Sequence, residues 1–183
     1  MKKQPDFAEL FRNHFGDTPS KVTYQVRQDS NRFHDLVVLN SLIHDARFKR
    51  DQAVLRGKRL SISFERDCWE LGTVEHSDCA ELHIAQALLT LSPVLEIEWR
   101  FKHGTDFGSD TELWIQDIWL DRHATQEDDS MTVVINGFKW LCVITVRESE
   151  LKIRLQDLET PYLYSQRTKD RAKSSSVRDK PRR

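Results

Sequence analysis

Apolar and polar side chains alternate along several stretches of the chain. Between residues 95 and 101 every second side chain is apolar, and the side chains between them are charged. Residues 60–65 and 151–156 repeat this alternation, and residues 22–26 form a further candidate strand. Successive side chains of a β-strand point to opposite faces, so the pattern predicts strands in a sheet with one face in water.

A β-hairpin is predicted where two apolar runs, residues 131–135 and 138–146, flank Asn136-Gly137. Asn-Gly tolerates the positive φ angles of a type I′ turn, whose twist matches that of the flanking strands. Residues 151–156 then predict the third strand of a meander. Residues 113–120 are apolar at both odd and even positions, which predicts a strand covered on both faces. Five or six strands are expected in all.

Two stretches favour helix. Residues 31–47 carry apolar side chains at spacings of three and four, and Ser30 or Asn31 can serve as the N-cap. The apolar positions of this stretch are Phe33, Leu36, Leu39, Ile43 and Ala46. A second helix is predicted from Asp78 to the Ser92-Pro93 step, because Ala and Leu favour helix and Pro ends it. A strand is the alternative for this second stretch, and residues 7–14 predict a short additional helix.

Length and composition predict one domain. The chain has 183 residues with 38% hydrophobic content, which is enough for one core and too little for two. We expect a single mainly-β globular domain at residues 1–164 and a disordered basic tail at residues 165–183. The predicted fold class is α+β, mainly β: an antiparallel sheet, arranged as a meander, a barrel-like closure or a sandwich, with one or two packed helices.

The basic tail is the strongest charge feature of the sequence. Residues 165–183 hold eight Lys or Arg against two Asp, so residues 1–164 carry a formal charge of −7 out of a total of −1. Tail cations could neutralise phosphates of a nucleic acid. The candidate contacts are Arg167, Lys169, Arg171 and Lys173. A tail that is merely solvated is the favoured alternative, because it lacks aromatic residues for base stacking and the domain beside it is acidic.

Cysteine usage and hydropathy indicate the compartment. Three cysteines, an odd number in a chain of this length, argue against a disulfide framework and for a reducing environment. No signal peptide is readable at the N-terminus, and no run of 18 apolar residues occurs. We therefore expect a soluble cytoplasmic protein without a membrane partner.

The common catalytic motifs are absent from the sequence. It contains no Gly-Lys-Ser/Thr phosphate loop, no Gly-rich dinucleotide turn, no Gly-x-Ser-x-Gly elbow and no His-Glu-x-x-His. We expect no catalytic residues and no required cofactor, and favour a binding role over an enzymatic one.

A cluster of Cys and His is a candidate zinc site. His76, Cys79 and His83 follow Cys68, and two Cys with two His suit zinc. If the helix from Asp78 forms, Cys79 and His83 lie four residues apart on one helical face. The distance in sequence from Cys68 to His76 is not a standard zinc spacing, however. The alternative interpretation makes the cysteines buried hydrophobic residues and the histidines surface residues.

Two His-Asp pairs bracket the first predicted helix. His34-Asp35 and His44-Asp45 are ten residues apart, which separates them by about 15 Å along a helix. That separation is too large for one shared ion. We interpret Asp35 and His44 as surface residues whose charges favour the helix dipole.

Trp119 is the candidate partner-binding residue. We expect most of the five tryptophans to lie in the core. Trp119 differs because it has the parity of Asp117 and Asp121, which predicts an outward-facing indole beside two carboxylates. Tryptophan is enriched in protein interfaces, so these three residues predict a partner surface.

The stretch Leu42-Ile43-His44-Asp45-Ala46 precedes a β region. In this stretch and in general make-up the chain resembles small, stand-alone, β-rich bacterial proteins of uncharacterised families, some of which neutralise a toxin by binding it. The resemblance carries no functional residue across. The sequence thus predicts a non-catalytic protein- or ligand-binding module, with a zinc-binding protein and a nucleic-acid-associated protein as the alternatives.

Overall fold

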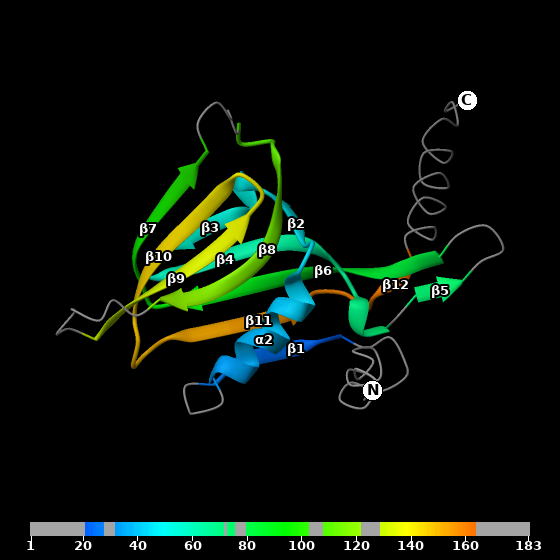
Figure 1. Cartoon of the computed structure of the whole chain (residues 1–183), viewed down its shortest axis with the longest axis horizontal. Coiled ribbons are helices and arrows are strands. Elements are labelled where there is room, and N and C mark those ends of the chain that lie inside the picture. The colour runs from blue at the N-terminus through cyan, green and yellow to red at the C-terminus, as the bar shows by residue number, and fades with distance from the viewer. Residues whose placement is uncertain are drawn as a thin grey trace, which may run out of the picture.

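The computed structural model describes residues 21–27, 32–71, 73–75, 80–102, 108–121 and 129–163. In these residues it shows antiparallel β-structure with one α-helix (Figure 1), which confirms the predicted α+β, mainly β fold class. The predicted helix at residues 7–14 and the tail at residues 165–183 lie outside the described residues.

The elements follow one another in a fixed order along the chain. They are β1 Thr23–Val26, α2 Arg32–Ile43, β2 Arg47–Lys49, the 3₁₀ turn η1 Arg50–Gln52, β3 Ala53–Arg56, β4 Arg59–Asp67, the 3₁₀ turn η2 Trp69–Leu71, β5 Thr73–Glu75, β6 Ala80–Ser92, β7 Val94–Phe101, β8 Glu112–Asp121, β9 Ser130–Gly137, β10 Trp140–Arg147, β11 Lys152–Asp157 and β12 Tyr162–Leu163.

The described strands form one curled sheet with two facing layers. Its order is β1-β11-β6-β4-β2-β8-β9-β10-β7, with β3 paired to β4 and both β5 and β12 paired to β6. The strand β2 pairs with β4 on one side and β8 on the other, and so joins the layers. The β8–β9–β10–β7 layer faces the viewer in Figure 1, and the view from behind shows β4, β6 and β11 in front.

The core fills the space between the layers. Side chains alternate between inward and outward along the long strands, except where the register shifts in β7 and β8. The inward residues form one cluster that includes Leu60, Ile62 and Phe64 of β4, Leu89 and Leu91 of β6, Ile153 and Leu155 of β11, Leu113, Ile115 and Ile118 of β8, Val133 and Ile135 of β9, and Ile144 and Val146 of β10. Because their burial is the dominant favourable term in folding, this cluster determines the pairing of the layers.

The helix α2 closes one open side of the curled sheet. It contacts β8, β1 and β4, and Leu39, Leu42 and Ile43 on its inner face are fully buried. The helix ends at Ile43, earlier than the predicted residue 47. The reason is that Asp45 takes a left-handed φ of 65° and the chain then turns into β2.

A β-bulge in β8 explains why residues 113–120 are apolar at both parities. The register to β9 shifts between Ile115 and Asp117. The extra residue returns Ile118 to the core face, which Leu113 and Ile115 also occupy. The prediction of a strand covered on both faces is therefore wrong, and Trp114 and Trp119 are exposed on the other face.

The predicted helix from Asp78 is wrong, since this stretch contains the central strand β6. Its side chains are buried at Ala87, Leu89 and Leu91 and half-buried between them, which is a period of two. The half-buried Leu88 obscures this period in the sequence. Pairing to β4 and β11 on either side overrides the helix propensity of Ala and Leu.

The predicted hairpin of β9 and β10 is present, but its turn lies two residues later than expected. Gly137 pairs with Trp140, so Phe138 and Lys139 form the turn, and Lys139 has a φ of 68°. A Cβ atom at Gly137 would overlap the Trp140 indole and the Trp114 carbonyl. Gly137 is therefore required by this close approach and not by a turn.

The strand β11 is confirmed, but its predicted place in a meander is wrong. It pairs with β6 and β1, whereas β10 pairs with β9 and β7. The loop after β10 thus carries the chain from one layer to the other.

A buried ion cluster lies at the end of the core. Arg66 of β4 is fully buried and donates to both oxygens of Asp157 at 2.8 Å each. It also donates to both oxygens of Glu70, at 2.6 and 3.0 Å. These bonds raise the pKa of Arg66 although burial alone would lower it. One guanidinium thus holds two buried carboxylates with paired hydrogen bonds.

The cluster also ties down neighbouring backbone. Asp157 accepts a bond from the Val22 N–H at 2.9 Å, and its own N–H donates to the Val22 carbonyl at 2.8 Å. Arg66 reaches the Leu42 carbonyl near the end of α2 at 3.5 Å. Four segments distant in sequence therefore meet at one charged group.

Gly137→Ala tests the close approach in the hairpin. Because the added methyl group must displace the Trp140 ring or the backbone of β8, we expect a loss of about 1–3 kcal/mol in the free energy of unfolding. Gly108→Ala is the matched control, since no atom lies near its Cβ position. Urea denaturation measures both, and equal effects in the two variants would contradict the explanation.

Arg66→Met tests the ion cluster. It leaves Glu70 and Asp157 buried without a cation, so we expect the free energy of unfolding to fall by about 3–5 kcal/mol. The control Arg154→Met removes an exposed arginine from β11 and should change stability by less than about 0.5 kcal/mol. A loss below about 1 kcal/mol for Arg66→Met in urea denaturation would show that the cluster does not stabilise the fold.

Candidate partner-binding surface

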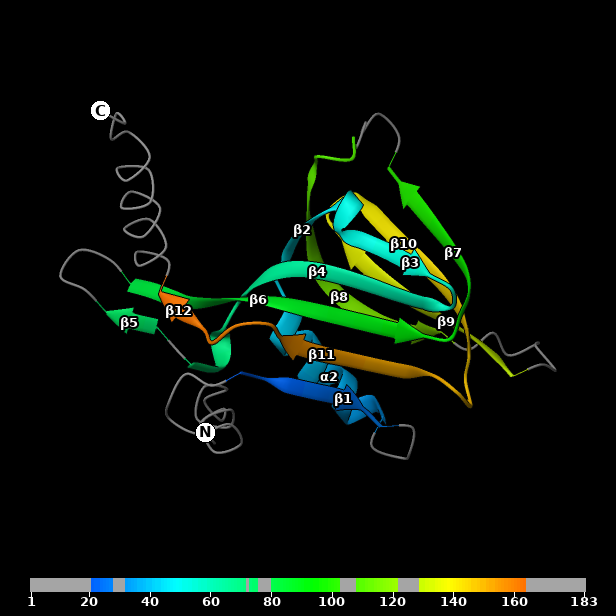
Figure 2. The same cartoon turned by 180° about the vertical axis from the view of Figure 1, so that it is seen from behind.

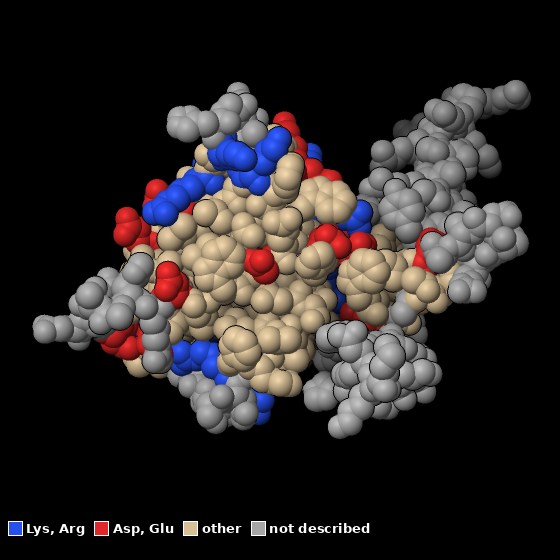
Figure 3. Space-filling view, in the orientation of Figure 1, with Lys and Arg blue, Asp and Glu red and all other residues tan. Residues whose placement is uncertain are grey.

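One side of the β8–β9–β10 layer points away from the core and is largely uncharged. Figure 3 shows a broad, mostly uncharged area with one acidic side chain near its middle, and charged side chains around the edge. We call this side the outer face. Its outward side chains include Trp119 on β8, Thr132 and Val134 on β9, and Leu141, Val143 and Thr145 on β10.

A cross-strand row forms the apolar centre of the outer face. Val134 lies directly opposite Trp119 on one side and Val143 on the other. Directly opposite side chains touch, and Val134 is only 7% exposed although it does not belong to the core cluster. Trp119 remains 40% exposed, so the row presents aromatic surface to solvent.

An apolar groove continues the outer face between β8 and α2. Its volume is about 590 Å³. Phe33, Leu36 and Val37 line it from the helix, and Trp119 and Leu120 line it from the strand. A groove of this size can hold one large side chain of a partner.

The exposure of Phe33 corrects the predicted inner face of the helix. Leu36, Leu39 and Ile43 are buried as predicted, but Phe33 is 79% exposed. Val37, one helical turn further on, is 45% exposed. Residues four apart lie on the same side of a helix, so Phe33 and Val37 form one apolar edge of the groove.

Asn40 fixes the helix against the bulge of β8. Its side-chain amide donates to the Ile118 carbonyl at 2.9 Å and accepts from the Ile118 N–H at 2.6 Å. These are the two bonds that a neighbouring strand would otherwise supply to Ile118. Because Ile118 adjoins Trp119, the same contact fixes the two walls of the groove relative to each other.

Asp35 fixes the beginning of the helix. The Arg27 side chain donates to it twice at 2.9 Å, the Arg27 N–H donates at 2.8 Å, and the Tyr24 hydroxyl donates at 3.0 Å. The bonds from Arg27 lower the pKa of Asp35 to about 2, whereas burial and then Asp35 itself raise the pKa of Tyr24 to about 12. Asp35 is 2% exposed, so its predicted role as a surface residue is wrong.

Two carboxylates flank Trp119 along β8. From the bulge onward alternation places Asp117, Trp119 and Asp121 on the outer face, with Asp121 exposed and Asp117 half-buried. One carboxylate oxygen of Asp117 is buried and has no hydrogen-bond partner in the described part of the chain. The rim beside Trp119 is therefore acidic.

The other tryptophans divide between core and surface. Trp140 is buried and Trp99 is half-buried beside it, with ring centroids 5.7 Å apart. Trp69 and Trp114 are each 44% exposed. The expectation that most tryptophans lie in the core is wrong, since only these two pack there.

The structure places only part of the candidate zinc cluster. Cys68 is fully buried, burial raises its pKa, and its N–H donates to the His83 carbonyl at 2.7 Å. His76 and Cys79 lie outside the described residues. No group of three or more metal-ligating side chains occurs within the described ranges. The helical spacing argument for Cys79 and His83 fails, because His83 lies on strand β6.

The second His-Asp pair lies beyond the end of α2. The His44 ring contacts the Asp45 carboxylate at 2.9 Å, and both side chains are partly exposed. His44 therefore follows the helix and does not occupy its last turn. The candidate nucleic-acid residues Arg167, Lys169, Arg171 and Lys173 lie outside the described residues, so their role stays a prediction.

Comparison of the chain with protein-family models, curated proteins and solved structures found no match. The functional argument therefore depends on the geometry of this chain alone. Within the part of the chain that the structure describes, no helix combines the length and the apolar character needed to cross a membrane.

Asp35→Asn tests the anchor of α2 through its pH dependence. The pKa of Asp35 is lowered from 3.8 to about 2 in the folded protein. The ionised carboxylate therefore stabilises the fold above about pH 4, and this stabilisation is lost as the pH falls through about 2. We expect the wild type to exceed Asp35→Asn in unfolding free energy above about pH 4, with the difference shrinking towards about pH 2.

Urea denaturation across this pH range measures the difference. The control Asp51→Asn replaces an exposed carboxylate on η1 and should show almost no difference from the wild type at any of these pH values. A difference between wild type and Asp35→Asn that stays constant down to about pH 2 would contradict the assignment.

Proposed function

We propose that this protein is a non-catalytic binding module that docks a protein partner on the outer face and in the adjoining groove. The observation that carries the proposal is the exposed apolar set formed by Phe33, Val37 and Trp119 around one groove. Large apolar side chains gathered in this way cost free energy in water and mark interaction sites.

The arrangement of the outer face supports a protein partner. Interfaces combine an apolar centre poor in charge with a polar rim, and their binding energy concentrates in a few residues such as Trp and Tyr. The row of Trp119, Val134 and Val143 provides such a centre, and Asp117 and Asp121 lie in the neighbouring rows on either side of it. The strands that carry these residues are held by the core, so binding requires little ordering.

Charge indicates the chemistry of the partner. The carboxylates beside Trp119 and the formal charge of −7 over residues 1–164 both favour a partner with basic side chains around an apolar anchor. We therefore commit to a basic protein surface with one protruding apolar side chain. Neutralisation of a toxin by direct binding, which some proteins similar in general make-up perform, is one use of such a surface and stays a prediction.

Trp119→Ala tests the proposal in a quantitative capture experiment with the full-length protein. We expect a basic partner that the wild type retains and Trp119→Ala loses, with an affinity at least about 30-fold weaker, because interface tryptophans contribute about 2 kcal/mol or more. Phe33→Ala should also weaken binding. Isothermal titration calorimetry with the identified partner measures the change.

The matched control is Trp69→Ala, which removes an equally exposed tryptophan from η2. It should bind like the wild type. Capture that is equal for Trp119→Ala and Trp69→Ala would overturn the proposal. So would sedimentation of the wild type as a dimer that Trp119→Ala converts to a monomer, because the occupant of the outer face would then be a second copy of this chain.

A further inference from the structure

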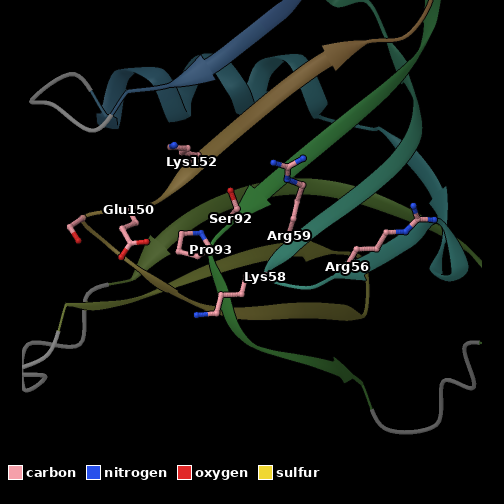
Figure 4. Close-up of a pocket in the computed structure, with 8 residues that line it drawn as sticks. Arg56, Lys58, Arg59, Ser92, Pro93, Glu150 and Lys152 are labelled. Atoms are coloured by element: carbon pink, nitrogen blue, oxygen red, sulfur yellow. The ribbon is translucent and has the colours of Figure 1, made fainter.

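A second surface feature is a strongly cationic pocket, which differs from the apolar outer face in its charge. Its volume is about 620 Å³, and Arg56, Lys58, Arg59 and Lys152 line it together with Ser92 and Glu150. Figure 4 shows Arg56, Lys58, Arg59, Ser92, Glu150 and Lys152 on β3, the β3–β4 turn, β4, β6, the loop before β11 and β11, with Arg56 at the opposite end of the group from Glu150. Four cations and one carboxylate thus line the pocket.

The backbone under the pocket is fixed by pairing. Lys152 lies opposite Ser92, and Arg56 lies opposite Arg59. The Lys58 carbonyl accepts a bond from the Val94 N–H at 2.8 Å. The β3–β4 turn, the start of β7 and the start of β11 are therefore held together without help from a ligand.

The tight turn between β3 and β4 requires glycine. Gly57 has a φ of 58°, which lies in the left-handed region that other residues rarely adopt. This turn brings Arg56 and Arg59 into direct opposition across the hairpin. Like charges at directly opposite positions repel each other and destabilise the pair.

No described residue compensates this repulsion. All four cationic side chains are exposed, and none of them has an ion-pair or hydrogen-bond partner in the described ranges. The carboxylate of Glu150 contacts Arg147 at 3.0 Å. The four cationic side chains are therefore free to bind an anionic ligand.

We infer that this pocket binds a small ligand that carries two or more phosphate groups. Arginine presents a planar fork of N–H donors that matches phosphate oxygens, and lysine adds a compact charge. A single carboxylate or phosphate would leave most of the four cations without a counterion. The volume lies in the range of small-molecule sites, and the Ser92 hydroxyl offers a further hydrogen bond.

The site is independent of the proposed partner-binding role. Its residues lie on β3, β4, β6 and β11 and on the loops beside them, whereas the outer face belongs to β8, β9 and β10. Failure of one proposal therefore leaves the other untouched. Because all four cations are exposed, we expect affinity that falls steeply with added salt.

The test is isothermal titration calorimetry of the full-length protein with inorganic pyrophosphate and with adenosine diphosphate at low ionic strength. We expect both probes to bind, and the double variant Arg56→Ala/Arg59→Ala to weaken binding at least roughly tenfold. The variant Arg56→Lys/Arg59→Lys keeps the charge but loses the planar guanidinium groups. Its affinity should therefore lie between that of the wild type and that of Arg56→Ala/Arg59→Ala.

The matched control is Arg154→Ala, which removes an exposed arginine from β11, two residues along the strand from Lys152. Its affinity should stay within about twofold of the wild type. Because the altered side chains are exposed, all variants should keep the wild-type melting temperature to within a few degrees, and thermal denaturation checks this.

Four outcomes would overturn the inference. They are the absence of pyrophosphate binding at millimolar concentration, unchanged affinity in Arg56→Ala/Arg59→Ala, equally tight binding of hexaglutamate at the same arginines, and arginine-dependent binding of a single-stranded oligonucleotide without binding of pyrophosphate. The second would place anion binding elsewhere on the chain. The third would assign the pocket to carboxylates, and the fourth to a nucleic acid strand.

Discussion

The guanidinium of Arg66 is the constraint on which the rest of the structure depends. It is buried at the end of the core, and its pairing with Glu70 and Asp157 makes that burial tolerable. Through Asp157 the cluster holds the backbone of Val22, and Arg66 also reaches Leu42. The start of β1, the strands β4 and β11, and the last turn of α2 are thereby brought together, and the position of α2 determines the groove.

Alternation in the sequence predicted strands correctly where apolar side chains face the core and the polar side chains between them face away from it. In the strands at residues 60–65 and 151–156 every apolar position is buried and every polar position between them is more exposed. Prediction failed where a contact distant in sequence decided the outcome. The bulge in β8 follows from its pairing with β9, and β6 is a strand because β4 and β11 flank it. At the β9–β10 hairpin, Gly137 meets the Trp114 carbonyl of β8, which is distant in sequence.

The candidate surface was predictable only in part for the same reason. The exposure of Trp119 and its parity with Asp117 follow from local alternation. The groove beside Trp119 does not, since it needs the amide of Asn40 to hold α2 against β8. Helical spacing assigned Phe33 to the core, whereas Phe33 is exposed and lines the groove. The cationic pocket combines residues from positions 56 to 152, which share no sequence signal.

Site-resolved hydrogen exchange of the intact protein tests the central role of the Arg66 cluster most directly. The amide of Val22 donates to the buried Asp157 carboxylate although Val22 precedes the first residue of β1. If the cluster holds these segments, this amide exchanges as slowly as the amides of Leu89 and Leu155 in the central strands, through global unfolding. Exchange of Val22 at the rate of an exposed loop would contradict the account.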